Sequence, residues 1–213
     1  ITIMPRGRAL GYTMVLPDQD KYSTTRSEML NQLAYMLGGR AAEELIFHDP
    51  TTGAANDIEK ATSVARSMVT QFGMTERLGA IKYGQEQSEV FLGRDMGHTR
   101  DYSEEVAAAI DEEVRGFIEA AHQEAYDVLV NNREILDAMV LALLERETLA
   151  KAEIEEIFAE LKLQSPRPAW TGSARRAPDT RGPIPFPPAS SNGHSASSAI
   201  EPALNESRDP DAQ

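Results

Sequence analysis

A long run of apolar residues at helical spacing constrains the fold of this sequence most. Between Ser103 and Val128 every third or fourth residue is apolar, and Ser103 followed by two glutamates is typical of a helix start. Residues three and four apart share one helix face, so this stretch predicts one long amphipathic helix. Shorter stripes predict further helices that begin near Thr25, Thr51, Asn131 and Thr148. In the helix after Thr51 the predicted apolar face includes Ile58 and Phe72, and Gly73 is expected to end the helix. Together the stripes predict a mainly α fold in which the apolar faces pack into a helical bundle.

The first of these helices carries two signals of opposite meaning. Thr25 and Glu28, three residues apart, form a capping box that favours a helix start. Gly38 and Gly39 then interrupt the helical pattern, which resumes and runs to Phe47. The glycine pair is either a kink or a place where another helix packs closely.

The N-terminal residues predict a small β-hairpin. Residues 1–16 alternate in part between apolar and polar, and the turn composition Pro5-Arg6-Gly7 divides them into two short strands. One interpretation is a hairpin that only closes the core. The other is an edge strand that holds an extended substrate by its backbone groups, formed by Leu10, Gly11, Tyr12 and Thr13.

Composition limits the partners of the chain. It has 213 residues, enough for one domain with a core, and a formal net charge of −13. Beyond Gln164 five Arg balance five acidic residues, so the excess of negative charge lies in residues 1–164. An acidic body argues against nucleic acid as a partner, because phosphate binding needs a basic face. There is no Cys, so a metal site would have to use His and carboxylates.

The character of the sequence changes at Gln164. Nine of the 12 Pro residues follow it, together with many small polar residues and few large apolar ones. Such a segment buries too little surface to offset the entropy lost on ordering. We therefore expect a folded domain over residues 1–164 and a disordered tail over residues 165–213. Trp170, near the start of the tail, is an aromatic residue able to dock on the body.

Asp57 is the first candidate functional residue. It lies near the start of the helix predicted after Thr51, beside Asn56. A carboxylate there complements the positive end of the helix dipole, which is an ordinary structural role. The alternative is a metal ligand, for which a single Asp with no His or Cys nearby is a weak signal.

Glu43 and Glu44, at the end of the first helix, also allow two interpretations. They form a solvated face with Arg40 as partner, or one of them orients a metal-bound His, as carboxylates near such sites often do. Glu44 is the preferred candidate for the second role. His48 follows at the helix end, where an exposed position is expected.

Several segments, in the right order over about residues 1–161, resemble the protease domain of the FtsH family, which are membrane-anchored, ATP-dependent zinc metalloproteases. The resemblance lies in Ile3-Met-Pro-Arg-Gly-Arg-Ala-Leu-Gly11, Gly38-Gly-Arg-Ala-Ala-Glu-Glu44, Thr52-Gly-Ala-Ala-Asn-Asp-Ile58, Met68-Val-Thr-Gln-Phe-Gly-Met74 and Glu89-Val-Phe-Leu-Gly-Arg94.

The resemblance implies a helical zinc-metallopeptidase domain in which Asp57 is the third zinc ligand. In that family two His ligands and the general-base Glu lie in a His-Glu-x-x-His helix. None of the four His residues here begins such a motif. We therefore expect the motif upstream of Ile1, no catalytic residue in this chain, and no activity from the chain alone. The glycine pair would then pack closely against that helix, and Glu44 would orient a zinc-bound His.

The implied function is that of the C-terminal part of an ATP-dependent zinc metalloendopeptidase that degrades unfolded or unassembled proteins. ATP would bind an upstream ATPase module, since the chain has no phosphate-binding loop of its own. The resemblance further implies protein substrates, a homo-oligomeric hexameric ring, and anchoring at the cytoplasmic face of the cell membrane through upstream segments. The alternatives are a non-catalytic helical assembly or interaction module, and a degenerate relative that never had the His pair.

Overall fold

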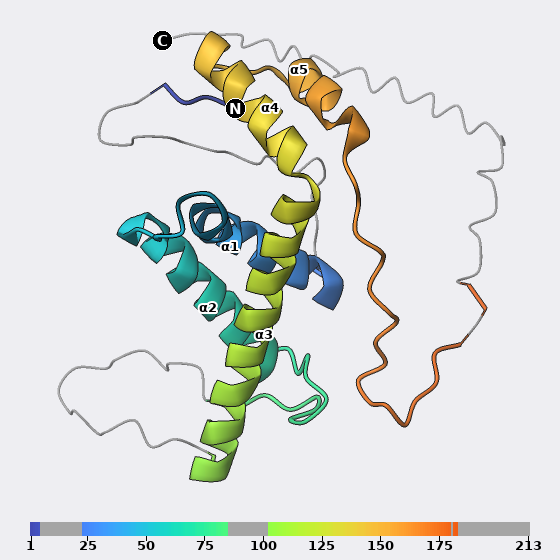
Figure 1. The fold of residues 1–213 in the computed structure, drawn as a ribbon. Coiled ribbons are helices and arrows are strands. Elements are labelled where there is room, and N and C mark those ends of the chain that lie inside the picture. The colour runs from blue at the N-terminus through green and yellow to red at the C-terminus, as the bar shows by residue number, and fades with distance from the viewer. Residues whose placement is uncertain (5–22, 85–101, 180, 183–213) are drawn as a thin grey trace, which may run out of the picture. The chain divides into compact units, whose positions relative to one another are not determined.

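A computed structural model describes residues 1–4, 23–84, 102–179, 181 and 182 of the chain. The chain divides into two compact units, Ile1–Pro178 and Asp179–Gln213, and everything below concerns the first. Within its described residues the unit is built from helices and contains no sheet, in line with the predicted mainly α fold (Figure 1). The segment Glu89–Arg94, which carries part of the family resemblance, lies outside the described residues.

The first helix, α1, spans Arg26–Phe47. Its capping box is confirmed: the Thr25 hydroxyl accepts from the Glu28 backbone N–H, and the Glu28 carboxylate accepts from the Thr25 N–H at 2.8 Å. The predicted interruption at Gly38 and Gly39 is wrong, because α1 runs through both without a break. Leu37 and Ala41 are buried on either side of the pair and hold the helix against its neighbours, which outweighs the weak helix propensity of glycine.

The second helix, α2, spans Ala55–Thr70 and follows a short 3₁₀ turn, η1, at Thr52–Ala54. The helix stops where the sequence predicts, since Gly73 has a φ of +59° and the Met74 N–H donates back to the Met68 carbonyl at 2.9 Å. A Cβ at Gly73 would lie 2.6 Å from the Cα of Ala80. Glycine is therefore required here both by its conformation and by the close approach of the backbone.

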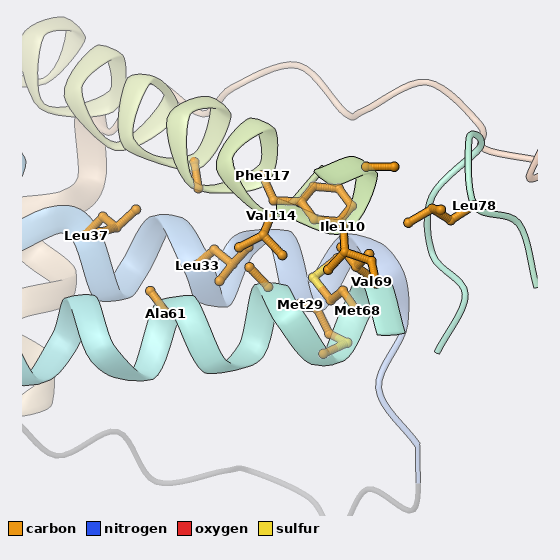
Figure 2. Packing of buried hydrophobic residues seen from close by; sticks show 13 residues of the cluster. Met29, Leu33, Leu37, Ala61, Met68, Val69, Leu78, Ile110, Val114 and Phe117 are labelled. Carbon is orange, nitrogen blue, oxygen red and sulfur yellow. The ribbon is translucent and has the colours of Figure 1, made fainter. Parts of the chain in front are cut away.

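The core lies between α1, α2 and the long helix α3, Glu104–Asn131 (Figure 1). Figure 2 shows the side chains of the three helices converging, with Leu78 from the loop after α2 at one end. Leu33, Met68 and Ile110, one from each helix, are almost fully buried. The predicted apolar stripe of α3 therefore faces the core. Ile58 and Phe72, predicted on the apolar face of the second helix, are instead exposed.

The last two helices are α4, Arg133–Arg146, and α5, Lys151–Ile157, which is followed by a 3₁₀ turn, η2, at Phe158–Glu160. The side chain of Asn132, just before α4, donates to the Val128 carbonyl of α3 and accepts from the Lys162 N–H at 2.8 Å. Because Lys162 follows η2, these bonds join the start of α4 to the residues after η2. The expectation that the stripe of α4 packs into the bundle is wrong for the described residues. No residue of α4 is buried, and Leu141 and Leu144 are 67% and 68% exposed.

The first four residues pair with the connection between α4 and α5. Thr2 forms an isolated antiparallel bridge with Thr148, and the Ile3 N–H donates to the Glu147 carbonyl at 3.0 Å. Leu149, 2% exposed, anchors that connection. The described residues therefore give no support to the predicted N-terminal hairpin, because the strand partner of Thr2 comes from another part of the chain. The second strand of that hairpin, including Leu10, Gly11, Tyr12 and Thr13, lies outside the described residues.

Candidate metal centre

Asp57 is the third residue of α2 and its side chain is exposed. The residue in the N-cap position is Ala54, whose side chain offers no acceptor, and no side chain caps the helix by a hydrogen bond. Among the residues that the structure describes, none pairs with the Asp57 carboxylate. The charge of Asp57 complements the positive end of the helix dipole, but its oxygens are not used in a hydrogen-bonded cap. They are available to a ligand.

Glu43 ties the start of this region to the end of α1. Its carboxylate accepts from the Thr51 N–H at 2.9 Å and from the Thr51 hydroxyl at 2.7 Å. The Thr51 hydroxyl in turn accepts from the Gly53 N–H at 3.2 Å, at the start of η1. These hydrogen bonds, the one from the hydroxyl above all, lower the pKa of Glu43 below its ordinary value. The turn that leads into α2, the helix that carries Asp57, is thus tethered to α1 by an ionised carboxylate.

The sequence does not predict the contact between Glu43 and Thr51. It favours the neighbouring Glu44 as the residue that orients a metal-bound His. The signal was present in Thr51-Thr52-Gly53, a composition that favours side-chain capping of the following turn. What the sequence did not contain was the approach of Thr51 to Glu43, eight residues earlier.

Glu44 connects α1 to α3. One oxygen accepts from the Arg40 Nε at 2.6 Å, which confirms Arg40 as the partner that the surface interpretation expected. The other lies 2.9 Å from the Nε2 of His122 on α3. That nitrogen is buried and its contact with Glu44 is not aligned as a hydrogen bond, so the attraction between them is electrostatic when His122 is protonated. Orientation of a zinc-bound His by Glu44 stays a prediction.

His48 ends α1 in a left-handed conformation, and its Nδ1 lies 3.0 Å from the Glu44 carbonyl oxygen. Its side chain is exposed, as the sequence predicts.

Asp57 fits the role of one metal ligand in a larger set. Zinc sites that carry out catalysis use three protein ligands and keep one position open. Within residues 1–4, 23–84, 102–179, 181 and 182, no three His, Cys, Asp or Glu side chains are grouped to hold a metal ion. An exposed, unpaired carboxylate on a tethered helix start suits a ligand that completes a site together with other residues.

Residues 1–157 match the sequence profile of Peptidase family M41. The chain belongs to Peptidase family M41. The match covers all five described α-helices, α1 to α5, and it confirms the family that the sequence segments resemble.

Three relatives of this M41 chain are named ATP-dependent zinc metalloproteases. The FtsH of Cutibacterium acnes (strain SK137) is 60% identical over 187 residues, which cover 88% of this chain and 26% of the relative. The FtsH of Mycobacterium tuberculosis (strain ATCC 25618 / H37Rv) is 51% identical over 187 residues, 88% of this chain and 25% of the relative. FtsH 1 of Thermoanaerobacter sp. (strain X514) is 52% identical over 158 residues, 74% of this chain and 26% of the relative.

The M41 chain thus spans about a quarter of the length of these relatives. A match over 187 of its 213 residues runs past Gln164, so the similarity to the first two relatives includes part of the Pro-rich segment. No described helix of the chain has the length and apolar character needed to cross a membrane.

Proposed function

We propose that this chain supplies Asp57 as a zinc ligand to an ATP-dependent zinc metalloendopeptidase that degrades unfolded or unassembled proteins. The observation that carries the proposal is the exposed, unpaired carboxylate of Asp57 on the first turn of α2. It lies within the residues that match Peptidase family M41. The names of the relatives, which specify zinc, ATP and protease, support the same activity.

Zinc in such a site lowers the pKa of a bound water and polarises the peptide carbonyl. The part of this chain is to hold one carboxylate oxygen of Asp57 in place. The Glu43–Thr51 tether limits movement of the turn that precedes α2. Glu44 is proposed to orient a zinc-bound His from the end of α1. The strand Leu10 to Thr13 is proposed to hold the extended substrate.

The remaining parts of the proposed enzyme come from the full-length protein. They are a His-Glu-x-x-His helix with the general base, an ATPase module, and membrane segments that place the protease at the cytoplasmic face. The proposed assembly is a hexameric ring acting on protein substrates. Gly38 and Gly39 support the first of these parts, because no described atom beyond the adjacent backbone of α1 lies within 4 Å of a Cβ built on either glycine. That face of α1 has room for another helix.

The test uses the full-length protein with Asp57→Asn and, as a matched control, Glu59→Gln. Glu59 is an exposed carboxylate two residues further along α2 without a described partner. Asp57→Asn should abolish degradation of an unfolded protein and lower the bound zinc, while ATP hydrolysis persists. Glu59→Gln should change none of these. Full proteolysis by Asp57→Asn would contradict the ligand role.

A second candidate function, a helical assembly module without chemistry of its own, is favoured by the exposed apolar residues of α4. Val140, Leu141 and Leu144 lie on the described surface without cover. Wild-type zinc content and proteolysis in the full-length protein exclude this alternative, whereas an assembled protein that binds no zinc supports it.

A further inference from the structure

We propose that the groove between α1 and α3 is a peptide-binding site, and that its ligand is the chain's own segment Pro166–Trp170. The groove is lined on the helices by Ser27, Asn31, Ala120, Gln123, Glu124 and Asp127. The chemical class of the ligand is a short basic peptide in which prolines flank an arginine and an aromatic residue follows. The segment belongs to the same compact unit as the helices, and Figure 1 shows it extended, without helix or strand, after α5. The proposal is independent of the zinc chemistry above.

Arg167 is the anchor of the bound segment. Its Nη2 lies 2.5 Å from both carboxylate oxygens of Glu124 on α3. Its Nη1 donates to the Asn31 side chain and to the Ser27 carbonyl, both on α1, at 2.5 and 3.3 Å. One guanidinium group therefore bridges two helices. The Arg167 and Glu124 side chains are 26% and 27% exposed, so the pair is better shielded from water than an ordinary surface ion pair.

Trp170 supplies the second contact. The guanidinium carbon of Arg26 lies 4.7 Å from the centre of the Trp170 ring and 5.5 Å from the centre of the Phe117 ring. Arg26 is thus placed between an aromatic residue of the segment and one of α3, an arrangement that favours a cation. Its Nε also donates to the Met74 carbonyl at 3.0 Å, which fixes the position of the guanidinium.

The groove and the segment are complementary in charge, and the segment is conformationally restricted before it binds. Residues 165–178 contain three Arg and no acidic residue, whereas the excess negative charge of the chain lies in residues 1–164. Pro166 and Pro168 on either side of Arg167 restrict the unbound segment, which lowers the entropy lost on binding. One contact opposes binding: burial first, and then the positive charge of Arg167, lower the pKa of Arg26, so the two guanidinium groups repel each other. The ion pair with Glu124 offsets this repulsion.

A third contact follows the aromatic residue. The Ala174 N–H donates to the Glu76 carboxylate, in the loop that follows α2, at 2.7 Å. The segment and the residues just after it are therefore held at three places: by Arg167 on α1 and α3, by Trp170 on Arg26, and by Ala174 on the loop after α2. Contacts spread along the segment in this way favour one direction and register of binding over loose association.

Trp170 is the only Trp of the chain, so its fluorescence reports binding directly. The experiment measures quenching of Trp170 by acrylamide in the full 213-residue chain. Arg167→Ala and Glu124→Gln should each lower the ratio of bound to free segment about tenfold, the size expected for loss of a charge-assisted hydrogen bond. In these two variants the acrylamide quenching of Trp170 should rise towards that of a synthetic peptide with the sequence of residues 164–176. The quenching in Arg167→Lys should lie between that of the wild type and that of Arg167→Ala, since an ammonium group does not span both helices.

The matched controls are Arg175→Ala and Glu119→Gln. Arg175 lies five residues after Trp170 and Glu119 lies on the same helix as Glu124, and neither side chain has a described partner. Both variants should quench like the wild type. Circular dichroism of every variant should show unchanged helix content. Equal quenching of Arg167→Ala and wild type would overturn the proposal.

Dilution distinguishes the chain's own segment from that of a second copy. Binding within one chain predicts quenching that does not depend on protein concentration. Quenching that rises on dilution would mean that the segment of another molecule fills the groove, and would overturn the intramolecular assignment.

Discussion

Glu43, in the last turns of α1, accepts hydrogen bonds from both the backbone and the hydroxyl of Thr51, immediately before the turn that leads into α2. The pair joins the two ends of the connection between the helices. Because Asp57 lies in the first turn of α2, the direction in which its carboxylate faces depends on this contact. Glu43, which has no proposed role at the metal, thus positions Asp57, the proposed ligand.

The Glu43–Thr51 contact should depend on pH. The folded pKa of Glu43 lies below its ordinary value of 4.5, so the stabilising contribution is fully present above pH 4.5 and is lost as the pH falls through the folded pKa. We expect the Thr51 amide resonance to titrate in that acidic range in the wild type and not in Glu43→Gln. A Thr51 amide that titrates identically in both proteins would contradict the contact.

Two roles of Glu44, the proposed orientation of a zinc-bound His and the contact with His122 on α3, should have separable effects. In the full-length protein, Glu44→Gln is expected to lower proteolysis about 10- to 100-fold, as is typical when a carboxylate that orients a metal ligand is lost. His122→Gln removes the attraction to α3 but leaves the Glu44 carboxylate in place, so its proteolysis should stay close to that of the wild type. Equal losses in both variants, matched by equal losses of stability, would mean that Glu44 only holds α1 to α3.

Replacement by alanine should affect stability differently at the glycines inside helices and at Gly73, which follows the end of α2. In the chain as printed, Gly38→Ala, Gly39→Ala and Gly116→Ala should each raise the free energy of unfolding by up to about 1 kcal/mol, because each position is helical and open among the described residues. Gly73→Ala should lower it, since its Cβ would strike the backbone of Ala80. Urea unfolding measures all four.

The same variants test the space beside α1 in the full-length protein. If a helix packs on Gly38 and Gly39, their alanine variants should lose proteolysis while Gly116→Ala keeps it. Retained activity in all three would contradict close packing at the glycine pair.

Core and surface leucines should differ sharply in stability. Leu33 has no exposed surface, and Leu33→Ala should cost about 2 to 5 kcal/mol of the free energy of unfolding. Leu141, on the open face of α4, should change it by less than about 0.5 kcal/mol when replaced by Ala. Denaturant unfolding of the isolated chain measures both. A large cost at Leu141 that depends on protein concentration would show that α4 is covered by another copy in solution.

The sequence predicted those features whose cause is local. The capping box at Thr25 and Glu28 is a contact between residues three apart. The end of α2 at Gly73 follows from a backbone conformation that other residues rarely adopt. The stripe of α3 faces the core because its spacing matches the helix. Each of these signals is contained in one short stretch of sequence.

The features that the sequence did not predict depend on long-range contacts. The continuity of α1 through Gly38 and Gly39 depends on burial of Leu37 and Ala41 against other helices. The strand-like residue Thr2 pairs with Thr148 rather than within a hairpin. The contact of Arg167 with Glu124 joins residues 43 apart, and neither residue type nor spacing indicates it. At the candidate site, Asp57 and Glu44 were assigned by resemblance to a family, whereas the contacts of Glu43 and His122 come from the fold.

The most direct measurement of the central claim places a thiolate at position 57 of the full-length protein and replaces zinc with cobalt(II). The printed chain has no Cys, so Asp57→Cys adds a single thiol to it. A direct bond from residue 57 to the metal predicts a thiolate-to-cobalt charge-transfer band in Asp57→Cys that is absent from Glu59→Cys and from the wild type. Cobalt bound by Asp57→Cys without that band would show that residue 57 does not touch the metal, and would contradict the account.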